Sequence, residues 1–142
     1  MRVLIAGSKT ASEEELAHAA MAVRARLEAT GATDVEIVNP SPARWEDIRR
    51  LEGGWEALYR WVARAHDGVV LLPVRMAGDG AVLSRGCYEI ASLVRAAGKL
   101  VAVYDGQRLR RAAELRRLPE ADWKRGWGEA RLADVREGEG AR

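Results

Sequence analysis

The sequence has little of several features that would assign it to a class at once. It contains one cysteine, Cys87, so no disulfide can form within the chain. Its longest apolar runs, such as residues 69–74, are much shorter than the roughly 20 residues of a membrane-spanning helix. The net charge is only +2, with 23 Lys and Arg against 21 Asp and Glu, which gives little general attraction to nucleic acid or an acidic membrane. The partner therefore has to be inferred from local motifs.

Other absences exclude particular kinds of catalytic chemistry. Phenylalanine does not occur, and we attach no mechanism to that bias. The two histidines, His18 and His66, have no evident partner in the sequence, and no spacing typical of metal ligands occurs. We therefore expect no metal, no cofactor and no thiol–histidine enzyme. The first residues, MRVLIAG, lead directly into a strand-like run instead of an apolar signal segment with a cleavage site, which predicts a cytoplasmic protein.

The length and composition are those of an ordinary globular domain. The chain has 142 residues, of which 48% are hydrophobic and 31% charged. A domain of this size buries roughly 70% of the surface that its unfolded chain exposes, so the core needs no disulfide or metal. We expect one domain at residues 1–135 and a polar tail at residues 136–142.

Short apolar runs alternate with segments of helical periodicity. Ser12, followed three residues later by Glu15, has the form of a capping box that opens a helix. Pro42 suits the first residue of another helix, which Gly53-Gly54 separates from the next. Strands are expected at residues 2–6, 35–38, 69–72, 100–104 and 131–135, helices after Ser12, Pro42, Gly54 and Ser84 and at residues 107–118, and a mobile loop at residues 75–80.

This alternation predicts an α/β fold. Strands that are apolar along their whole length are typical of a parallel sheet that is buried on both faces. We expect a single-domain three-layer α/β/α sandwich, Rossmann- or flavodoxin-like, around a mostly parallel sheet of about five strands. In such sheets, ligands bind at the carboxyl ends of the strands near the topological switch point. The segments after the first, third and fourth strands are therefore the candidate sites.

The segment after the first strand is Gly7-Ser8-Lys9-Thr10. It offers backbone N–H groups, two hydroxyls and an ammonium group near a helix start, which suits an anionic oxygen. A turn followed by helix capping explains the same residues. The segment is not a Walker A loop, because that motif needs a further glycine before a Gly-Lys pair.

The segment after the third strand is richer in polar groups. Because Cys87 and Ile90 occupy the core face of the expected helix, we expect Glu89 to point away from the core, toward the strand ends and a bound sugar. A surface carboxylate that stabilises the helix dipole is the other interpretation of Glu89. Gly86, in the first helical turn, suits the close approach of a ligand or of another backbone. The segment consists of Gly78, Asp79 and Gly80 in the loop and Ser84, Arg85, Gly86, Cys87, Tyr88 and Glu89 at the helix start.

Two further patterns have a plain structural interpretation. Trp55 and Tyr59 lie on one apolar helix stripe, which favours core packing over base stacking. A group of arginines is expected to form a solvated helix face, or to meet a nucleotide phosphate across an oligomer interface. These are Arg108, Arg110, Arg111, Arg116 and Arg117.

The motifs together resemble those of the nucleoside 2-deoxyribosyltransferase superfamily. They are Gly7-Ser8, Asp67-Gly68-Val69-Val70, Ser84-Arg85-Gly86-Cys87-Tyr88-Glu89-Ile90 and Gly98-Lys99-Leu100-Val101. The chain is similar especially to small members that hydrolyse the N-glycosidic bond of nucleoside 5′-monophosphates. The resemblance implies that Glu89 attacks the anomeric carbon and that Ser8 and Ser84 contact phosphate or sugar oxygens. The substrate-binding residues it implies are Gly7, Ser8, Lys9, Asp79, Ser84, Gly86 and Tyr88.

The resemblance also implies a reaction. A carboxylate captures or stabilises an oxocarbenium-like sugar while the base departs, and water or a second base then accepts the sugar. The family's second carboxylate falls near Tyr59, where the nearest acid is Glu56. Asp79 and Tyr88 are the other candidates for protonating the leaving base. The expected partner is a nucleoside or nucleotide, and the expected assembly is a homodimer or larger homo-oligomer. Trp123 and Trp127 either form such an interface or cover the edge of the sheet.

Two other similarities support different functions. The Ser-x-x-Cys-x-Glu arrangement also looks like the glutamate helix of TIR domains, which cleave a nicotinamide N-glycosidic bond. Residues 73–89 are loosely similar to a nucleotide-processing or nucleotide-sensing Rossmann-like group. A non-catalytic nucleotide-binding or sensing domain is therefore the alternative to an enzyme, and a purely structural role is the third interpretation.

Overall fold

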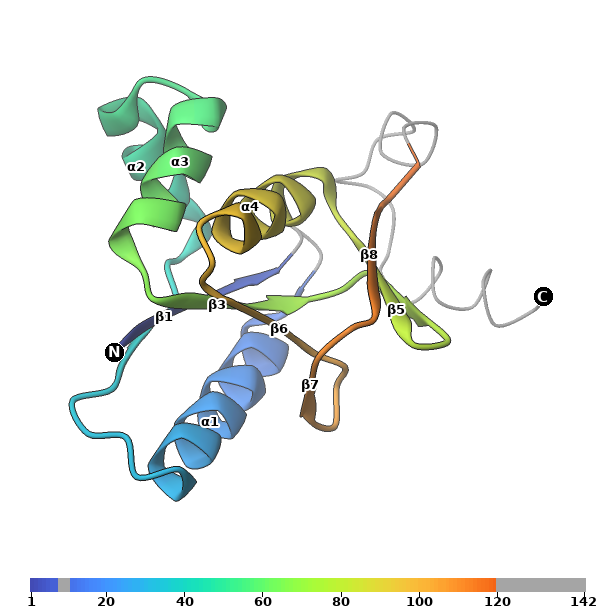
Figure 1. Ribbon diagram of the computed structural model, residues 1–142. Coiled ribbons are helices and arrows are strands. Elements are labelled where there is room, and N and C mark those ends of the chain that lie inside the picture. Colours follow the sequence, from blue (N-terminus) through green and yellow to red (C-terminus); the bar gives the residue numbers. More distant parts are fainter. Residues whose placement is uncertain (8–10, 120–142) are drawn as a thin grey trace.

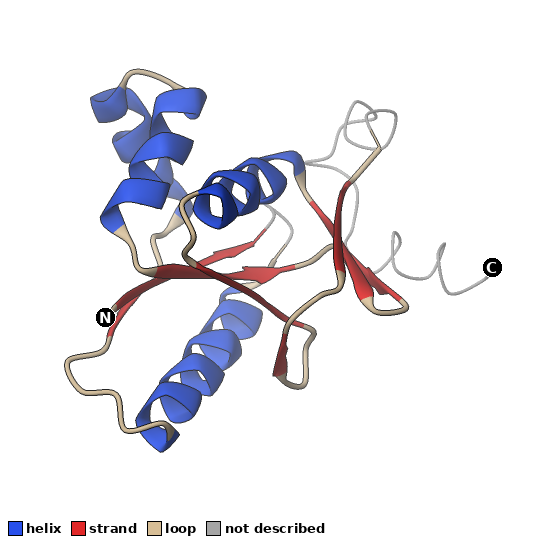
Figure 2. Cartoon of the chain, in the orientation of Figure 1, coloured by secondary structure: helices blue, strands red, loops and turns tan. Residues whose placement is uncertain are grey.

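The computed structural model describes residues 1–7 and 11–119, and it confirms the α/β fold. Within these residues, five strands form a sheet of order β2-β1-β3-β6-β7, with α1 on one face and α2, α3 and α4 on the other (Figures 1 and 2). The elements are β1 (Arg2–Gly7), α1 (Glu13–Ala29), β2 (Glu36–Val38), α2 (Pro42–Glu52), α3 (Trp55–Ala65), β3 (Gly68–Leu72), β4 (Arg75–Ala77), β5 (Gly80–Leu83), α4 (Arg85–Ala96), β6 (Leu100–Tyr104), β7 (Leu109–Arg110) and β8 (Glu114–Arg117).

The central strands are apolar because helices cover both of their faces. Every residue of β3 is buried, and so are the four central residues of β1. Alternate side chains enter two separate cores. Leu4, Val69 and Leu71 pack beneath α3 and α4, whereas Val3, Ile5 and Val70 pack against α1.

The order of the strands places the topological switch between β1 and β3. The chain leaves β1 toward β2 on one side, and it leaves β3 toward β6 on the other. The last residues of these strands, Gly7 and Leu72, are paired neighbours. At Gly7, a Cβ atom would lie 2.8 Å from Cβ of Ala11, so the close approach of the next segment explains this glycine. Gly7 therefore lies at the switch point. The candidate residues Ser8 and Lys9, which follow it in the sequence, lie outside the described residues.

The capping predictions are confirmed. The Ser12 hydroxyl accepts from the Glu15 amide at 3.0 Å, and the Glu15 carboxylate accepts from the Ser12 amide at 3.3 Å. Pro42 is in the first turn of α2, and Gly53 ends that helix with a left-handed φ of 95°. The local sequence therefore determined where these helices begin and end.

The helix expected at residues 107–118 is wrong. Leu109 and Arg110 instead form β7, antiparallel to Val103 and Tyr104 of β6. The Asp105 carboxylate accepts from the amides of residues 107 and 108, at 2.9 Å each, and so stabilises a tight turn after β6. After this turn the chain runs antiparallel to β6 at the edge of the sheet. Pairing with β6 stabilises a strand there, although the apolar residues are spaced as in a helix.

The loop expected at residues 75–80 is also wrong. Residues 75–77 and 80–83 form the antiparallel strands β4 and β5, and β8 pairs parallel with β5. Met76, Ala81 and Leu115 lie side by side across this second sheet and pack against the core beneath α4. Burial of one face stabilises the strands there. The strand expected at residues 131–135 and the side chains of Trp123 and Trp127 lie outside the described residues.

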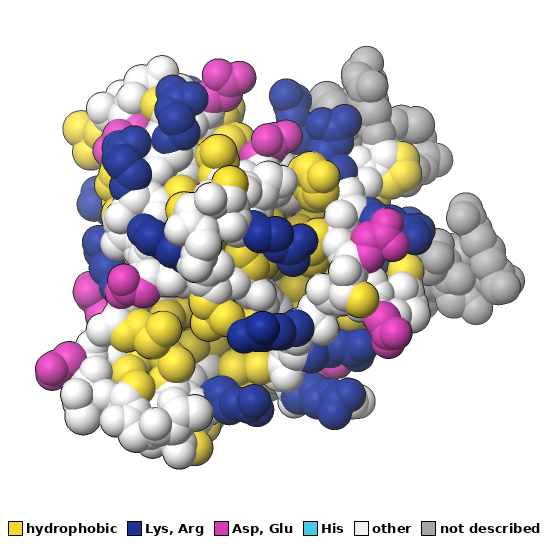
Figure 3. All heavy atoms as spheres, viewed as in Figure 1, with side chains coloured by type: hydrophobic (Ala, Val, Ile, Leu, Met, Phe, Trp, Pro, Cys, Tyr) yellow, Lys and Arg dark blue, Asp and Glu magenta, His cyan; other side chains and the backbone are white. Residues whose placement is uncertain are grey.

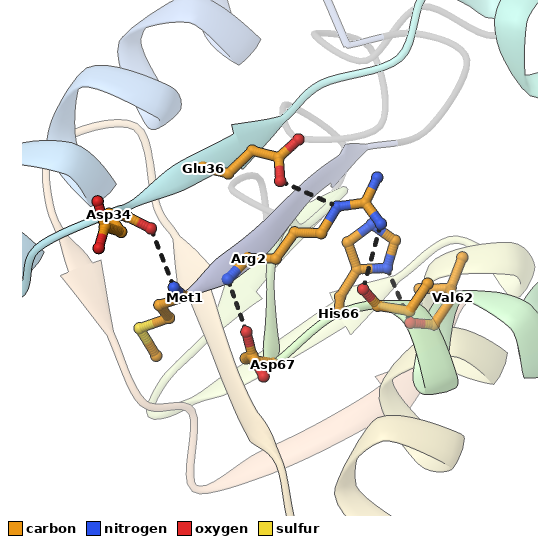
Figure 4. A network of polar contacts seen from close by, with 8 residues as sticks. Met1, Arg2, Asp34, Glu36, Val62, His66 and Asp67 are labelled. Atoms are coloured by element: carbon orange, nitrogen blue, oxygen red, sulfur yellow. Dashed lines mark hydrogen bonds and ion pairs between the residues drawn. The ribbon is translucent and has the colours of Figure 1, made fainter.

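A polar network joins three segments at the amino-terminal edge of the sheet (Figure 4). The Arg2 amide donates to Oδ2 of Asp67 at 2.7 Å. The Arg2 guanidinium group donates to the Ala65 carbonyl at 3.4 Å, and its Nε lies 3.4 Å from a Glu36 carboxylate oxygen. These contacts join β1 to β2 and to the turn between α3 and β3. They lie at the opposite end of the sheet from Gly7 and Leu72.

His66 is buried beside this network, with 2% of its surface exposed. Its Nδ1–H donates to the Val62 carbonyl at 2.9 Å, and its ring packs edge-on against Trp61. Burial lowers the pKa of His66 below its ordinary value of 6.5; the hydrogen bond to Val62 opposes this shift and the nearby Arg2 adds to it. His66 is therefore a neutral core side chain at neutral pH.

We expect the free energy of unfolding to decrease as the pH falls below about 6.5. The unfolded chain protonates His66 near its ordinary pKa, whereas the folded protein does so only at lower pH. Between these values the unfolded state binds more protons, so acid favours unfolding. Urea unfolding at about pH 7.5 and about pH 5.5 should show a smaller loss of stability in His66→Gln than in the wild type. Equal losses in the two proteins would exclude His66 as the cause.

Candidate functional site

The candidate nucleophile, Glu89, lies in the second turn of α4. The Ser84 hydroxyl caps this helix by accepting from the Cys87 amide at 3.4 Å. Residues 87, 90, 91 and 94 are buried, and Glu89 is half-buried outside that face. Glu89 therefore lies outside the core face of α4, while its direction toward the strand ends and a sugar stays a prediction. The Ser84 hydroxyl is engaged in the helix cap.

Tyr59 of α3 packs against this part of α4. A Cβ atom built on Gly86 would lie 3.2 Å from the Tyr59 hydroxyl oxygen. Residues three apart are neighbours on a helix surface, so Glu89 lies one turn beyond the residue that Tyr59 approaches. The sequence led us to expect a ligand or backbone beside Gly86. In the structure, the Tyr59 hydroxyl lies there.

An aromatic stack holds the Tyr59 ring in place. Trp55 stacks on Tyr59 with ring centroids 6.2 Å apart and an interplanar angle of 26°. The Arg49 guanidinium group lies 5.3 Å from the centroid of the Trp55 ring. The core packing expected for both rings therefore holds for Tyr59 but is wrong for Trp55, which is 43% exposed and contacts Arg49 and Tyr59 at the surface of α3 because it lies in the first turn of that helix.

Tyr59, Arg85 and Glu89 are close enough to influence one another electrostatically. Burial raises the pKa of the Tyr59 phenol above 10.0, Arg85 opposes the rise, and Glu89 adds to it. The phenol is therefore protonated at neutral pH. A carboxylate and a guanidinium group of α4 thus act electrostatically on a neutral phenol of α3.

This contact lies toward the carboxyl edge of the sheet. The carboxyl end of α3 is linked by a short turn to the amino end of β3, so the first turns of α3 lie toward the other edge. The carboxyl end of α4 likewise precedes the amino end of β6, which runs parallel to β3. The beginnings of both helices therefore lie on the side where α/β proteins bind ligands.

Cys87 has no nucleophilic role at this site. Its side chain is buried, and burial raises the pKa of the thiol to about 11, which the hydrogen bond with Ser84 opposes. The thiol is therefore protonated at neutral pH, and the thiolate is the reactive form. This confirms the interpretation of Cys87 as a small core residue.

The structure does not bring every candidate residue to Glu89. Asp79 lies at the turn between β4 and β5, with 92% of its side chain exposed, and pairs with Arg110 at 4.0 Å. Its carbonyl accepts from the Ala113 amide at 2.9 Å, so Asp79 belongs to the second sheet. Glu56 is exposed in the first turn of α3. Tyr88 is half-buried and packs against the core, and consecutive helix residues point in different directions.

Two surface hollows lie away from Glu89. One, on the α1 face, is lined by Glu15, His18, Leu72, Tyr104 and Gly106. The other runs along β2 and is lined by Arg2, Glu36, Ile37, Val38, Asn39, Pro40, Arg44, Ile48 and Trp61. No group of three or more His, Cys, Asp or Glu side chains in residues 1–7 and 11–119 is arranged to hold a metal ion.

Comparisons with models of protein families, with curated proteins and with solved structures find no match. The resemblance to the nucleoside 2-deoxyribosyltransferase superfamily therefore stays a prediction that rests on the motifs quoted above. None of the helices in the described part of the chain is both long and apolar enough to span a bilayer.

Sequence reasoning missed the place of Tyr59 against Gly86 of α4. The apolar spacing of α3 assigned Tyr59 to the core, and the structure does pack its ring against the core. One feature of the sequence could have indicated this place: the second carboxylate of the family that the chain resembles falls near Tyr59. Only the packing of α3 against α4 places the hydroxyl beside Gly86.

Proposed function

We propose that this protein cleaves or transfers the N-glycosidic bond of a nucleoside or nucleoside 5′-monophosphate, with Glu89 as the nucleophile. The observation that carries the proposal is that Tyr59 of α3 packs against Gly86, one helical turn before Glu89 on α4, where Arg85 and Glu89 act electrostatically on the Tyr59 phenol. A half-buried carboxylate beside a phenol and a cation, toward the ligand-binding edge of an α/β sheet, suits attack on an anomeric carbon.

The chemistry follows from the charge that develops on the sugar. As the base departs, positive charge builds on the anomeric carbon and the ring oxygen, and a nearby carboxylate stabilises or captures it. A covalent sugar ester on Glu89 divides one difficult displacement into two easier ones. Water as the second acceptor gives hydrolysis, and a second base gives transfer.

Surface charge supports an anionic substrate. Several basic side chains lie on the face that carries α4 and the second sheet, among apolar and acidic ones (Figure 3). Arg85, Arg95 and Arg117 are exposed there. The arginines expected on a helix belong instead to strands and turns, where Arg110 pairs with Asp105 at 3.3 Å and Arg116 with Glu114 at 2.9 Å. The arginines of this face would attract a phosphate.

We expect wild-type protein to release free base from at least one member of a panel of nucleosides, nucleoside 5′-monophosphates and NAD. Chromatography of the reaction mixtures identifies the base and the sugar product. A second base added in excess distinguishes transfer from hydrolysis, because transfer yields a new nucleoside. Intact substrates throughout the panel would contradict the proposed reaction. We place this activity in the cytoplasm and in a homodimer or larger homo-oligomer.

The second candidate is a nucleotide-binding or sensing domain without turnover. It is favoured by one observation: Glu56, the acid nearest to the second carboxylate position, is exposed in the first turn of α3. A ligand of such a domain would raise the midpoint of thermal unfolding without being consumed, because binding to the native state alone stabilises it. Thermal unfolding with the same panel therefore separates the two candidates.

A further inference from the structure

A departing base needs a proton if it is to leave as a neutral molecule. The acids expected from the sequence are poorly placed for this near Glu89. Asp79 pairs with Arg110 in the second sheet, Glu56 is exposed, and Tyr88, which directly precedes Glu89, points to another side of α4. Tyr59, at the α3–α4 contact, is a further candidate for the acid.

Tyr59 has the required position. Its hydroxyl oxygen would lie 3.2 Å from a Cβ at Gly86, one helical turn before Glu89 on the same side of α4. The stack with Trp55 restricts the ring, so the hydroxyl is held between the two helices. Arg85, one residue before Gly86, acts electrostatically on the same phenol.

We propose that Tyr59 is a catalytic residue that protonates the departing base, in place of a second carboxylate. This inference rests on the proposed function, since it assigns a second role in the same reaction. The phenol is protonated at neutral pH, as an acid must be before it acts. Arg85 favours the phenolate that forms when the proton is transferred, because its positive charge stabilises the anion.

The reaction balances with these two residues and water. A Glu89 carboxylate oxygen forms a bond to C1′ while the bond from C1′ to the base nitrogen breaks. The electron pair of that bond stays on the base, which takes the Tyr59 proton. Water then attacks C1′, displaces Glu89 as a carboxylate and returns a proton to the Tyr59 phenolate. The products are the free base and the free sugar, and no oxidant or reductant takes part.

The test compares two leaving groups in Tyr59→Phe. Guanosine 5′-monophosphate needs a proton on its departing base, whereas its 7-methyl derivative carries a cationic base that leaves as a neutral molecule. We expect Tyr59→Phe to release guanine at least about a hundredfold more slowly than the wild type. Release of 7-methylguanine should fall by less than about threefold, because no proton is required. The phenyl ring preserves packing against Trp55.

Tyr104→Phe is the matched control. It removes a tyrosine hydroxyl that donates to the Gly106 carbonyl at 3.3 Å, and Tyr104 packs in the core on the α1 face. Both substrates should react in this variant at wild-type rates. Thermal unfolding of each variant checks that the fold is intact.

The outcomes separate the inference from the proposed function. An equal decrease for both substrates in Tyr59→Phe would assign Tyr59 a structural role and overturn the inference alone. Unchanged guanine release would do the same. If the wild type releases base from other nucleotides but not from guanosine 5′-monophosphate, Tyr59→Phe is measured on a nucleotide that reacts, where an unchanged rate of base release would overturn the inference alone. If no nucleotide released its base, both would be wrong.

Discussion

Replacing Glu89 with glutamine is expected to lower the rate of base release at least about 1,000-fold. Glutamine has the same shape as glutamate, but its amide cannot form the sugar ester that the proposed reaction requires. Glu89 is half-buried outside the buried face of α4, so the change removes no core contact. The midpoint of thermal unfolding should therefore shift little while turnover is lost.

The measurement is the rate of base release at saturating substrate, by chromatography, for wild type and variant side by side. Glu28→Gln is the matched control, because Glu28 is an exposed glutamate near the end of α1 that pairs with Arg24 at 3.9 Å. It should react as the wild type does. Glu89→Gln protein that retains a substantial part of the wild-type rate would remove Glu89 from the role of nucleophile.

The second large effect concerns the stability of the fold. Replacing Leu71 with alanine is expected to lower the free energy of unfolding by about 3 kcal/mol. Leu71 lies in the central strand β3, has none of its surface exposed and packs in the core beneath α3 and α4. The shorter side chain loses buried apolar surface and leaves a cavity that paired neighbours on both sides of β3 cannot close.

Urea unfolding measures this difference, provided that the dependence on urea stays the same in both proteins. Leu51→Ala is the control, because Leu51 is 79% exposed on α2. The same change of side chain there should alter the free energy of unfolding by less than about 0.5 kcal/mol. Similar losses in the two variants would contradict the placement of β3 at the centre of the sheet.

The parts of the fold that the sequence predicted are those that local physics controls. Ser12 and Glu15 begin α1 because their side chains bond the first free amides, whatever the rest of the chain does. The uninterrupted apolar run at residues 69–72 requires burial on both faces, so it predicts a central parallel strand. The sheet and the helices on both of its faces followed from repeating this pattern.

The wrong predictions fall where two local patterns were almost equally good. Leu109 and Leu115 suit one helix face, but they also suit two short strands. The edges of β6 and β5 carry backbone N–H and C=O groups that only a strand can pair with. These residues therefore form β7 and β8 and not a helix. Residues 75–83 likewise form strands because the second sheet buries Met76 and Ala81 beneath α4.

The sequence by itself determined the class of fold, the helix starts at Ser12 and Ser84 and the position of Glu89 outside the core face of α4, because capping and periodicity depend on residues close together in the chain. Only the tertiary structure decided what surrounds Glu89. Tyr59 is 30 positions away along the chain, and its hydroxyl meets Gly86 because two helices pack on the same face of one sheet. Such a contact depends on the angle and depth of helix packing, which the side chains of the whole core set together.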